Sequence, residues 1–176
     1  MKKLKLKRLK LKDIEKLTIE INEMILVDNI NIYVNKYRSK EKLLNILKDK
    51  FSFGYFDKNN KLIALALVHI LNIDKNNKKS LKVDMVLVDK KYHGMGLQSK
   101  LQKNIDKKMN KGDIIRTRIM PFNIISLNNV LKNGYILEKI IYMNKDFTKE
   151  MEVLEVEKEI NKIEPIRLRH ILVKIK

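Results

Sequence analysis

Cysteine is absent from the 176 residues, and histidine occurs only three times. Disulfides and thiolate metal sites are therefore excluded. His69, His93 and His170 are widely separated in the sequence, so we expect no zinc site. The chemistry of the protein must rest on backbone amides, carboxylates, side-chain amides, hydroxyls and lysines.

Acidic residues are a minority: 21 Asp and Glu stand against 39 Lys and Arg, which gives a formal net charge of +18. This excess would suit a basic nucleic-acid-binding module, because clustered Lys and Arg neutralise phosphates and release counterions. Lysine is nevertheless spread along the whole chain, and aromatic residues for base stacking make up only 6%. We therefore interpret the excess of lysine as a compositional bias of the whole chain. The positive charge should still attract an anionic ligand, and a nucleic-acid-binding module stays an alternative.

Long apolar runs are also missing from the chain. No segment approaches the roughly 20 apolar residues of a membrane span, and the basic start, MKKLKLKRLKLKD, contains no uninterrupted apolar core. We therefore expect a cytoplasmic protein that does not associate with membranes. The length predicts a single domain over residues 1–176.

The hydrophobic pattern predicts a mixture of strands and helices. Leu4 and Leu6 alternate with lysines, which is typical of a half-buried first strand. Asp13 can cap a first helix, and Ser39 or a neighbour can cap a second. Asn123 is expected as the N-cap and Gly134 as the C-cap of a later helix. Further strands are expected at 51–57, 62–73, 81–89, 113–120, 135–143 and 166–176, and further helices from 97 to near 112 and at 124–134. Residues 146–164 form a charged insertion with a partly helical pattern.

Two of only five glycines, Gly94 and Gly96, stand two positions apart between an expected strand and an expected helix. Glycine lets an anion approach the backbone, and a helix N-terminus offers unpaired N–H groups and the positive end of its dipole. A tight loop that needs positive φ angles would explain the same spacing. A P-loop is excluded because no Gly-Lys-Ser/Thr is present, and Ser99 stands where the dinucleotide fingerprint has its third glycine.

Two motifs in order resemble the GNAT superfamily of acyl-CoA-dependent N-acyltransferases. The family's pyrophosphate loop, Gln/Arg-x-x-Gly-x-Gly/Ala, follows its fourth strand, and residues 91–96 read Lys-Tyr-His-Gly-Met-Gly. The second motif, an Asn-x-x-Ser/Ala helix closed by Gly-Phe or Gly-Tyr, is matched by Asn123, Ser126, Gly134 and Tyr135. The resemblance covers nearly the whole chain except residues 146–164.

The resemblance implies an α+β (mixed α/β) GNAT-like fold, with a mostly antiparallel central sheet, splayed fourth and fifth strands and flanking helices. Acetyl-CoA would be the acyl donor, with its pantetheine arm in the gap between those two strands. Lys91 replaces the family's Arg or Gln, which keeps a donor and loses the planar fork. The implied donor-binding residues are Leu87, Val88, Lys91, Tyr92, His93, Gly94, Met95, Gly96, Leu97, Gln98, Asn123 and Ser126.

The catalytic residues are less clearly marked. Asp84 is the one carboxylate inside an apolar strand, where related enzymes often carry an acidic residue that could act as general base. A solvent-facing side chain or a pair with a lysine would explain Asp84 equally well. His69, in the adjacent strand, is the other candidate base, although a satisfied core histidine would fit too. Val130 stands where the family commonly has a tyrosine, so the acid could be Tyr135, Tyr142 or water, and Tyr135 also fits a packing position.

Together these observations predict an N-acetyltransferase that passes the acetyl group of acetyl-CoA directly to a primary amine of a small molecule or peptide. A catalytically degenerate CoA-binding protein is a further alternative. Arg167, Arg169 and His170 could approach an anionic acceptor or form a solvated strand face. The insertion at 146–164 could cover the acceptor site or mediate a dimer, so a monomer and a homodimer both stay open.

Overall fold

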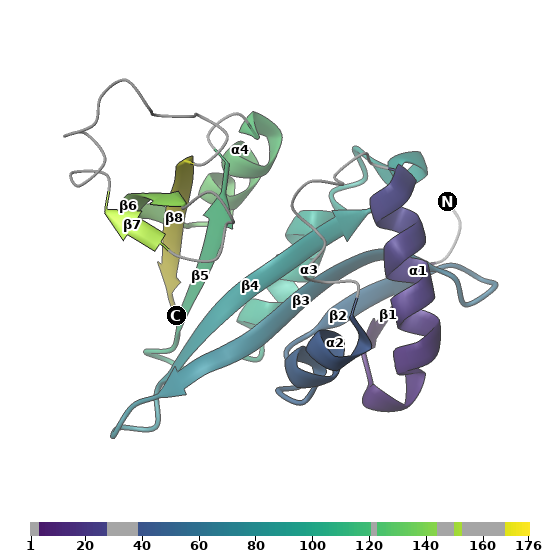
Figure 1. Cartoon of the computed structure of the whole chain (residues 1–176), viewed down its shortest axis with the longest axis horizontal. Coiled ribbons are helices and arrows are strands. Elements are labelled where there is room, and N and C mark those ends of the chain that lie inside the picture. The colour runs from purple at the N-terminus through teal and green to yellow at the C-terminus, as the bar shows by residue number, and fades with distance from the viewer. Residues whose placement is uncertain (1–3, 28–38, 121–122, 144–149, 153–167) are drawn as a thin grey trace. The chain divides into compact units, whose positions relative to one another are not determined.

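The computed structural model describes residues 4–27, 39–120, 123–143, 150–152 and 168–176 (Figure 1). The chain divides into two compact units. Unit 1 is Met1–Asp113 together with Lys176, and unit 2 is Ile114–Ile175. Each unit is described by itself.

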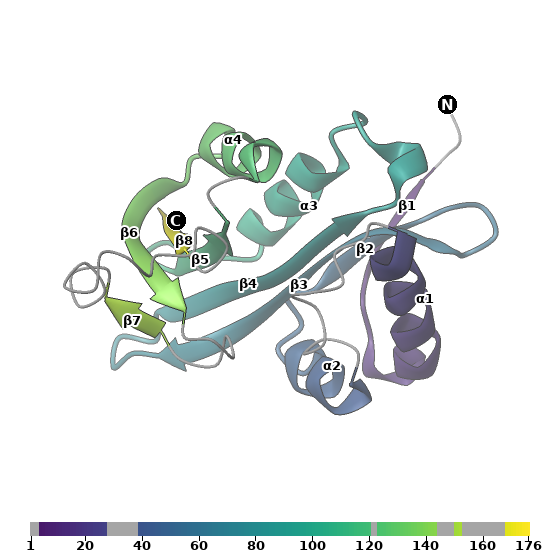
Figure 2. The ribbon, with the colours of Figure 1, turned by 45° about the horizontal axis from the view of Figure 1, so that its top comes forward.

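Unit 1 is an antiparallel sheet with helices on both faces. Its strands follow the order β1-β2-β3-β4, and the helices α1 and α2 lie on one face while α3 lies on the other (Figure 2). The elements are β1 (Lys5–Arg8), α1 (Ile14–Val27), α2 (Lys40–Leu47), β2 (Phe53–Phe56), β3 (Leu62–Ile73), β4 (Lys79–Val88) and α3 (Leu97–Asp106), with 3-10 turns η1 (Leu11–Asp13) and η2 (Lys90–Tyr92).

The core of unit 1 follows from the apolar stripes of its helices. The stripe of α1 packs with Leu43 and Leu47 of α2 against β3, whose first seven residues, 62–68, are all buried. On the opposite face, Leu101 and Ile105 of α3 are fully buried. Each such side chain stabilises the fold by about 1.5 to 3 kcal/mol. An apolar strand buried on both sides is what the sequence predicts for 62–73.

A β-bulge interrupts the ladder between β3 and β4. Leu67 pairs with Met85 and Val68 pairs with Val83, so that Asp84 is an extra residue on β4. A bulge bends its strand and re-aims the side chains beside it. The bulge therefore shifts the register of β4 against β3 on either side of Asp84.

Unit 2 contains antiparallel strands in the order β5-β8-β6-β7. Its elements are β5 (Ile114–Ile119), α4 (Ile124–Lys132), β6 (Ile136–Met143), β7 (Glu150–Glu152) and β8 (Leu168–Ile175). The last strand, β8, is inserted between β5 and β6 and pairs with both. Its position is therefore set by contacts between segments far apart in the sequence.

Capping residues fix the ends of two helices where the sequence predicts them. Ser39 Oγ accepts a hydrogen bond from Lys42 N at the start of α2 (3.3 Å). Gly134, with a φ of 85°, ends α4 in a Schellman turn in which Gly134 N donates to Leu131 O (3.0 Å) and Tyr135 N donates to Val130 O (3.2 Å).

The mixed α+β class and the antiparallel pairing within each unit are confirmed, and three expectations are wrong. The first strand, which pairs with β2 at one end of the described strand order, is exposed along its length rather than half-buried. The third helix ends at Asp106 rather than near Gly112, because the buried Asp113 carboxylate accepts from Asn110 N (2.8 Å) and from Lys79 N (2.8 Å) in a turn. Residues 150–152 of the charged insertion form the strand β7.

Two further expectations stay predictions. The fourth and fifth strands, β4 and β5, belong to different units, so the implied splay between them is not described. The single domain over 1–176 likewise stays a prediction. In the described ranges, no helix has both the length and the apolar character that crossing a bilayer requires.

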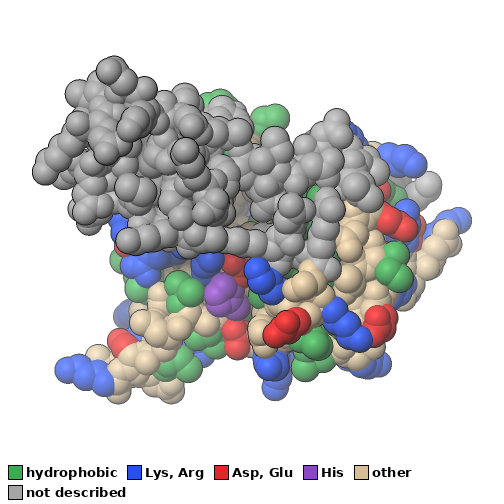
Figure 3. All heavy atoms as spheres, viewed as in Figure 1, with side chains coloured by type: hydrophobic (Ala, Val, Ile, Leu, Met, Phe, Trp, Pro, Cys, Tyr) green, Lys and Arg blue, Asp and Glu red, His purple; other side chains and the backbone are tan. Residues whose placement is uncertain are grey.

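Charged side chains of both signs are interspersed on the face of the molecule in Figure 3. Lys and Arg side chains are spread over the coloured part of this face, with Asp and Glu between them. This distribution differs from the single basic stripe that typically follows a nucleic-acid backbone.

Candidate functional site

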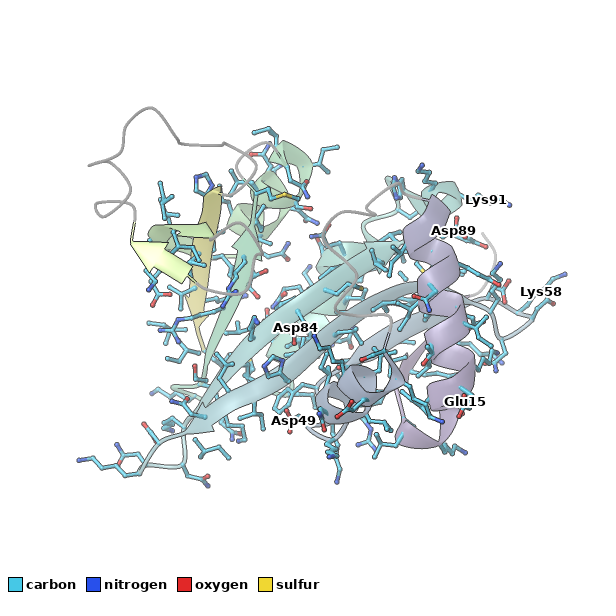
Figure 4. All side chains as sticks on the ribbon, viewed as in Figure 1. Glu15, Asp49, Lys58, Asp84, Asp89 and Lys91 are labelled. Atoms are coloured by element: carbon cyan, nitrogen blue, oxygen red, sulfur yellow. The ribbon has the colours of Figure 1, made fainter. Side chains whose placement is uncertain are left out.

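The loop that follows β4 is anchored at its first residues. Asp89 N donates to Ile63 O of β3 (2.8 Å), and Asp89 Oδ1 accepts from Lys91 N (2.9 Å). His93 Nε2 lies 2.9 Å from Val88 O and donates to that carbonyl. Figure 4 shows Asp89 and Lys91 together beyond the end of β4. The loop is therefore held to the sheet before the glycines begin.

The glycine segment leaves a row of backbone donors open. Gly94 and Gly96 have φ angles of 76° and 67°, and Gly96 is the N-cap residue of α3 without a side-chain cap. Within the described residues, five successive N–H groups have no acceptor, those of Gly94, Met95, Gly96, Leu97 and Gln98. The first turn of α3 contains no acidic side chain that could accept hydrogen bonds from these N–H groups. Such a row is suited to an anion.

The space above these donors is also open. A Cβ atom added at Gly94 or Gly96 would meet no other atom within 4 Å. Glycine is thus required by the positive φ, as a tight loop predicts, and no atom of the described residues crowds the two glycines. The residues present therefore fit a pyrophosphate. The need for positive φ angles and the approach of an anion are compatible explanations of the two glycines.

The remaining predicted donor-binding residues of unit 1 differ in exposure. Leu97 is buried and anchors the start of α3. Tyr92, Met95 and Gln98 are half-buried, whereas Lys91 and His93 are exposed. Leu97 thus has a packing role whatever its N–H group binds.

Leu87 and Val88, the two predicted donor-binding residues of β4, direct their backbone groups to opposite edges of the strand. Asp89 donates to β3, and hydrogen-bonding groups alternate between the two edges of an antiparallel strand. Leu87 therefore directs its N–H and C=O groups to β3, whereas Val88 and Val86 direct theirs to the opposite edge. Val86 is a position that sequence reasoning missed, because the edge to which a residue turns depends on register.

The predicted residues of unit 2 are described separately. Asn123 Oδ1 accepts from Ser126 N (3.2 Å), so Asn123 is the cap of α4 that the sequence predicts. Tyr135 is only 2% exposed at the start of β6, which fits the packing position. The roles of Asn123, Ser126 and Tyr135 towards substrates stay predictions.

Other candidate residues near the C-terminus are only partly described. His170 in β8 is half-buried. Arg167 and the side chains of Arg169 and Tyr142 lie outside the described residues. Across the described segments, no group of three or more His, Asp or Glu side chains could hold a metal ion.

Asp84 and His69, separate candidates in the sequence, are in contact in the structure. Asp84 Oδ2 accepts from His69 Nδ1, and Asp84 Oδ1 is 3.2 Å from Lys82 Nζ. The Asp84 side chain is 5% exposed, whereas the side chains of His69 and Lys82 are each 23% exposed. Asp84 is therefore not solvent-facing, and it pairs with the histidine as well as with a lysine.

The hairpin between β3 and β4 creates this cluster. His69 lies opposite Lys82 in the ladder, and the bulge adds Asp84 to the same contact. At the end of α2, Asp49 Oδ2 accepts from Ile70 N (2.7 Å), which fixes the backbone next to His69. Figure 4 shows Asp49 near Asp84 on this part of the sheet. No local spacing could have revealed the contact, because its two residues are 15 positions apart.

The hydrogen bond to Asp84 has a chemical consequence. A carboxylate that accepts from Nδ1 keeps the neutral imidazole in the tautomer whose Nε2 lone pair is available. An imidazole oriented in this way can accept a proton from a reacting group. Unit 1 thus contains an open anion site at the end of β4 and an oriented imidazole beside the middle of β4.

The similarity of this chain to known proteins lies in its fold. No protein-family model and no curated protein matches the sequence. Solved structures do match. Naa50 of Arabidopsis thaliana, in complex with the bisubstrate analogue CoA-Ac-MVNAL, aligns over 98% of this chain and 99% of its own, with a TM-score of 0.70 and 14% identity. The chain has the GNAT acetyltransferase fold.

Two further structures agree with this assignment. Arylalkylamine N-acetyltransferase 2 of Aedes aegypti covers 98% of both chains with a TM-score of 0.69 and 16% identity. A GNAT-family acetyltransferase of Streptococcus pneumoniae covers 99% of this chain and 100% of its own, with a TM-score of 0.67 and 12% identity. The GNAT fold predicted from two short motifs is confirmed.

Proposed function

We propose that the protein is an N-acetyltransferase that transfers the acetyl group of acetyl-CoA to a primary amine. The observation that carries this proposal is the row of five open N–H groups at the start of α3, in a chain with the GNAT fold. The neighbour solved with a CoA-containing bisubstrate analogue supports the choice of donor. A nucleic-acid-binding module is not favoured by this likeness.

The donor would be bound mainly by backbone groups of unit 1. Its pyrophosphate accepts from the N–H groups of residues 94–98, where the dipole of α3 adds to the attraction. Its pantetheine arm follows the edge of β4 to which Val86 and Val88 direct their hydrogen-bonding groups. Lys91 adds a point charge beside the pyrophosphate, and the net charge of +18 favours the approach of the anion.

The reaction needs a neutral amine and a thioester held together. The amine nitrogen attacks the thioester carbonyl, a C–N bond forms, the C–S bond breaks, and CoA leaves as the thiolate. The proton lost by the amine passes to a base on the protein or to water. Most of the acceleration in such a direct transfer can come from positioning the two reactants.

The acceptor would be either a peptide N-terminus or a small amine. Naa50 was solved with an analogue that contains a peptide, and the Aedes aegypti protein is an arylalkylamine N-acetyltransferase, so the neighbours support both classes. We further propose that the protein acts in the cytoplasm. Monomeric and homodimeric forms both agree with the proposal.

Calorimetric titration with acetyl-CoA at low salt tests the donor site. We expect micromolar binding by the wild-type protein and loss of binding by Gly94→Glu, because the new carboxylate occupies the approach to the N–H groups. Asn77→Glu is a matched control, because Asn77 also has a positive φ, of 61°, in an exposed turn. Wild-type protein that does not bind acetyl-CoA would disprove the proposal.

An amine panel tests the transfer itself. Peptides with free N-termini, arylalkylamines and polyamines would be mixed with acetyl-CoA, and release of the free thiol would be followed. We expect thiol release that depends on one class of amine. Tight CoA binding without thiol release for any amine would instead identify the degenerate CoA-binding protein.

A further inference from the structure

We infer that His69 is the general base of this acetyl transfer and that Asp84 positions it. The inference rests on the proposed function and deepens it. The sequence offers Asp84 and His69 as competing bases, whereas their contact in the structure gives them different roles.

Asp84 is poorly placed to take the proton itself. Both of its carboxylate oxygens already face donors, Oδ2 the Nδ1 of His69 and Oδ1 the Nζ of Lys82. Only 5% of the side chain is exposed, so an acceptor amine has little access to it. Protonation of the carboxylate would also break a charge-assisted hydrogen bond. Asp84 is therefore suited to orient a neighbour.

His69 has the free atom that a base needs. Its Nδ1 is used by Asp84, and no described residue forms a hydrogen bond with its Nε2. The side chain is 23% exposed, so a substrate or a water molecule can reach the ring. Histidine is also the side chain that most often serves as a general base in enzymes.

Among the described residues, charged groups lie beside His69 on β4 and after the end of α2. β4 contributes Asp84 and Lys82, whose opposite charges offset each other, and the end of α2 contributes Asp49. The Asp49 carboxylate binds Ile70 N and so holds the backbone of β3 beside the ring. The imidazole is thus fixed through its ring and through its strand.

The distance from the donor loop suits an extended pantetheine arm. Asp84 precedes Val88, at the end of β4, by four residues, which is about 13 Å along a strand. An arm that starts at the loop and follows β4 would bring the thioester towards the middle of the strand. There Nε2 accepts the proton of the attacking amine, directly or through one water molecule, as the C–N bond forms. The imidazolium then returns the proton to the departing thiolate or to solvent.

The first test is the variant His69→Asn, whose amide can still donate to Asp84. Thiol release from acetyl-CoA would be measured with the pentapeptide Met-Val-Asn-Ala-Leu and with tyramine as acceptors. We expect kcat to fall by about 10²- to 10⁴-fold, the usual contribution of a general base, while the Kd for acetyl-CoA changes less than about twofold. Asn72→Ala, at an exposed position of the same strand, is the control and should keep the wild-type kcat.

The second test examines Asp84 as a positioning residue through the pH profile. For the wild type, kcat/KM should fall at acid pH, because a protonated base cannot accept the proton of the amine. His69→Asn should lack this limb. Asp84→Asn should keep the limb with a shifted midpoint and a lower plateau, because His69 is present without its orienting carboxylate. A purely structural role of Asp84 would leave the midpoint in place.

The outcomes separate the inference from the proposed function. If the wild type transfers acetyl groups and His69→Asn does so at the same rate, the inference is overturned and the proposed function stands. If the wild type does not bind acetyl-CoA, both fail. If neither acceptor reacts, nitrogen NMR of the histidine rings decides: a neutral His69 with its proton on Nδ1 supports the inference, and a proton on Nε2 overturns it.

Discussion

The two ends of the proposed reaction path along β4 are built in different ways. The donor loop after Val88 uses backbone N–H groups from consecutive residues, and its glycines provide the conformation and the open approach. The cluster beside the middle of β4 uses side chains from two strands, His69 of β3 and Asp84 of β4, joined across a bulge. A backbone site can thus be recognised from a short motif, whereas a side-chain site depends on how the strands pair.

Gly96→Asp tests the donor loop and has the largest expected effect, which is a loss of acetyl-CoA affinity. An aspartate here would have to adopt the positive φ of Gly96, so the free energy of unfolding should fall by about 1 to 2 kcal/mol. The same charge, about 4 Å from the pyrophosphate, should weaken acetyl-CoA binding by 100-fold or more, since a like-charge pair near a surface costs about 4 kcal/mol.

Calorimetry and thermal unfolding of Gly96→Asp would be compared with those of Asn76→Asp, an exposed position in the turn between β3 and β4. Asn76→Asp should bind acetyl-CoA with nearly the wild-type Kd. Unchanged binding by Gly96→Asp would show that the N–H groups at the start of α3 are not the donor site.

Asp49→Ala should show that the middle cluster depends on long-range support. Loss of the hydrogen bond from Ile70 N should lower the free energy of unfolding by about 1 to 2 kcal/mol. It should also lower kcat/KM severalfold, since His69 is the neighbouring residue, and leave acetyl-CoA binding intact. Asp74→Ala is a matched control, because Asp74 also accepts from backbone N–H groups but in an exposed turn. Equal effects of both variants on kcat/KM would contradict the prediction.

The Arg116–Glu138 pair of unit 2 provides a cross-strand contact outside the proposed site and has the smallest expected effect. Arg116 reaches past β8 to form two hydrogen bonds of 2.7 Å with Glu138. These bonds hold the pKa of Glu138 below its ordinary value and raise the pKa of Arg116. Because both side chains are accessible to solvent, the pair should contribute only a few tenths of a kcal/mol.

The sign of this effect can be checked by denaturation at several pH values. The pKa of Glu138 is lower in the folded state, so the stabilisation is present above the unfolded value of about 4.3 and is lost as the pH falls through the folded value. The wild type should therefore exceed Glu138→Gln in stability at pH 7 and equal it near pH 3. A difference that persists at pH 3 would show that the carboxylate charge is not the cause.

Several elements could be read from the sequence because their signals are local. The range 62–73 was predicted for β3 and is observed without change, since its apolar run is bounded by polar turns on both sides. Ser39, Asn123 and Gly134 lie at helix ends as predicted, because caps depend on a few adjacent residues. Each of these features requires no knowledge of what packs against it.

The wrong expectations have a common physical cause. The strand β1 is exposed where it pairs with β2, whose residues are far away in the sequence. The early end of α3 depends on Asp113, whose carboxylate accepts from Lys79 N, 34 positions away. The strand β7 gains its hydrogen bonds from β6 despite a charged sequence with a partly helical pattern. In each case a contact with another part of the chain decided what the local pattern could not.

By itself, the sequence determined the order of most elements and the glycine loop between β4 and α3, because periodicity, caps and glycine conformation act over a few residues. Only the tertiary structure decided that β8 lies between β5 and β6, that Val86 and Val88 share one edge of β4, and that His69 meets Asp84. The reason is register: in an antiparallel sheet, one bulge changes which side chains face each other, and no short segment specifies that pairing alone.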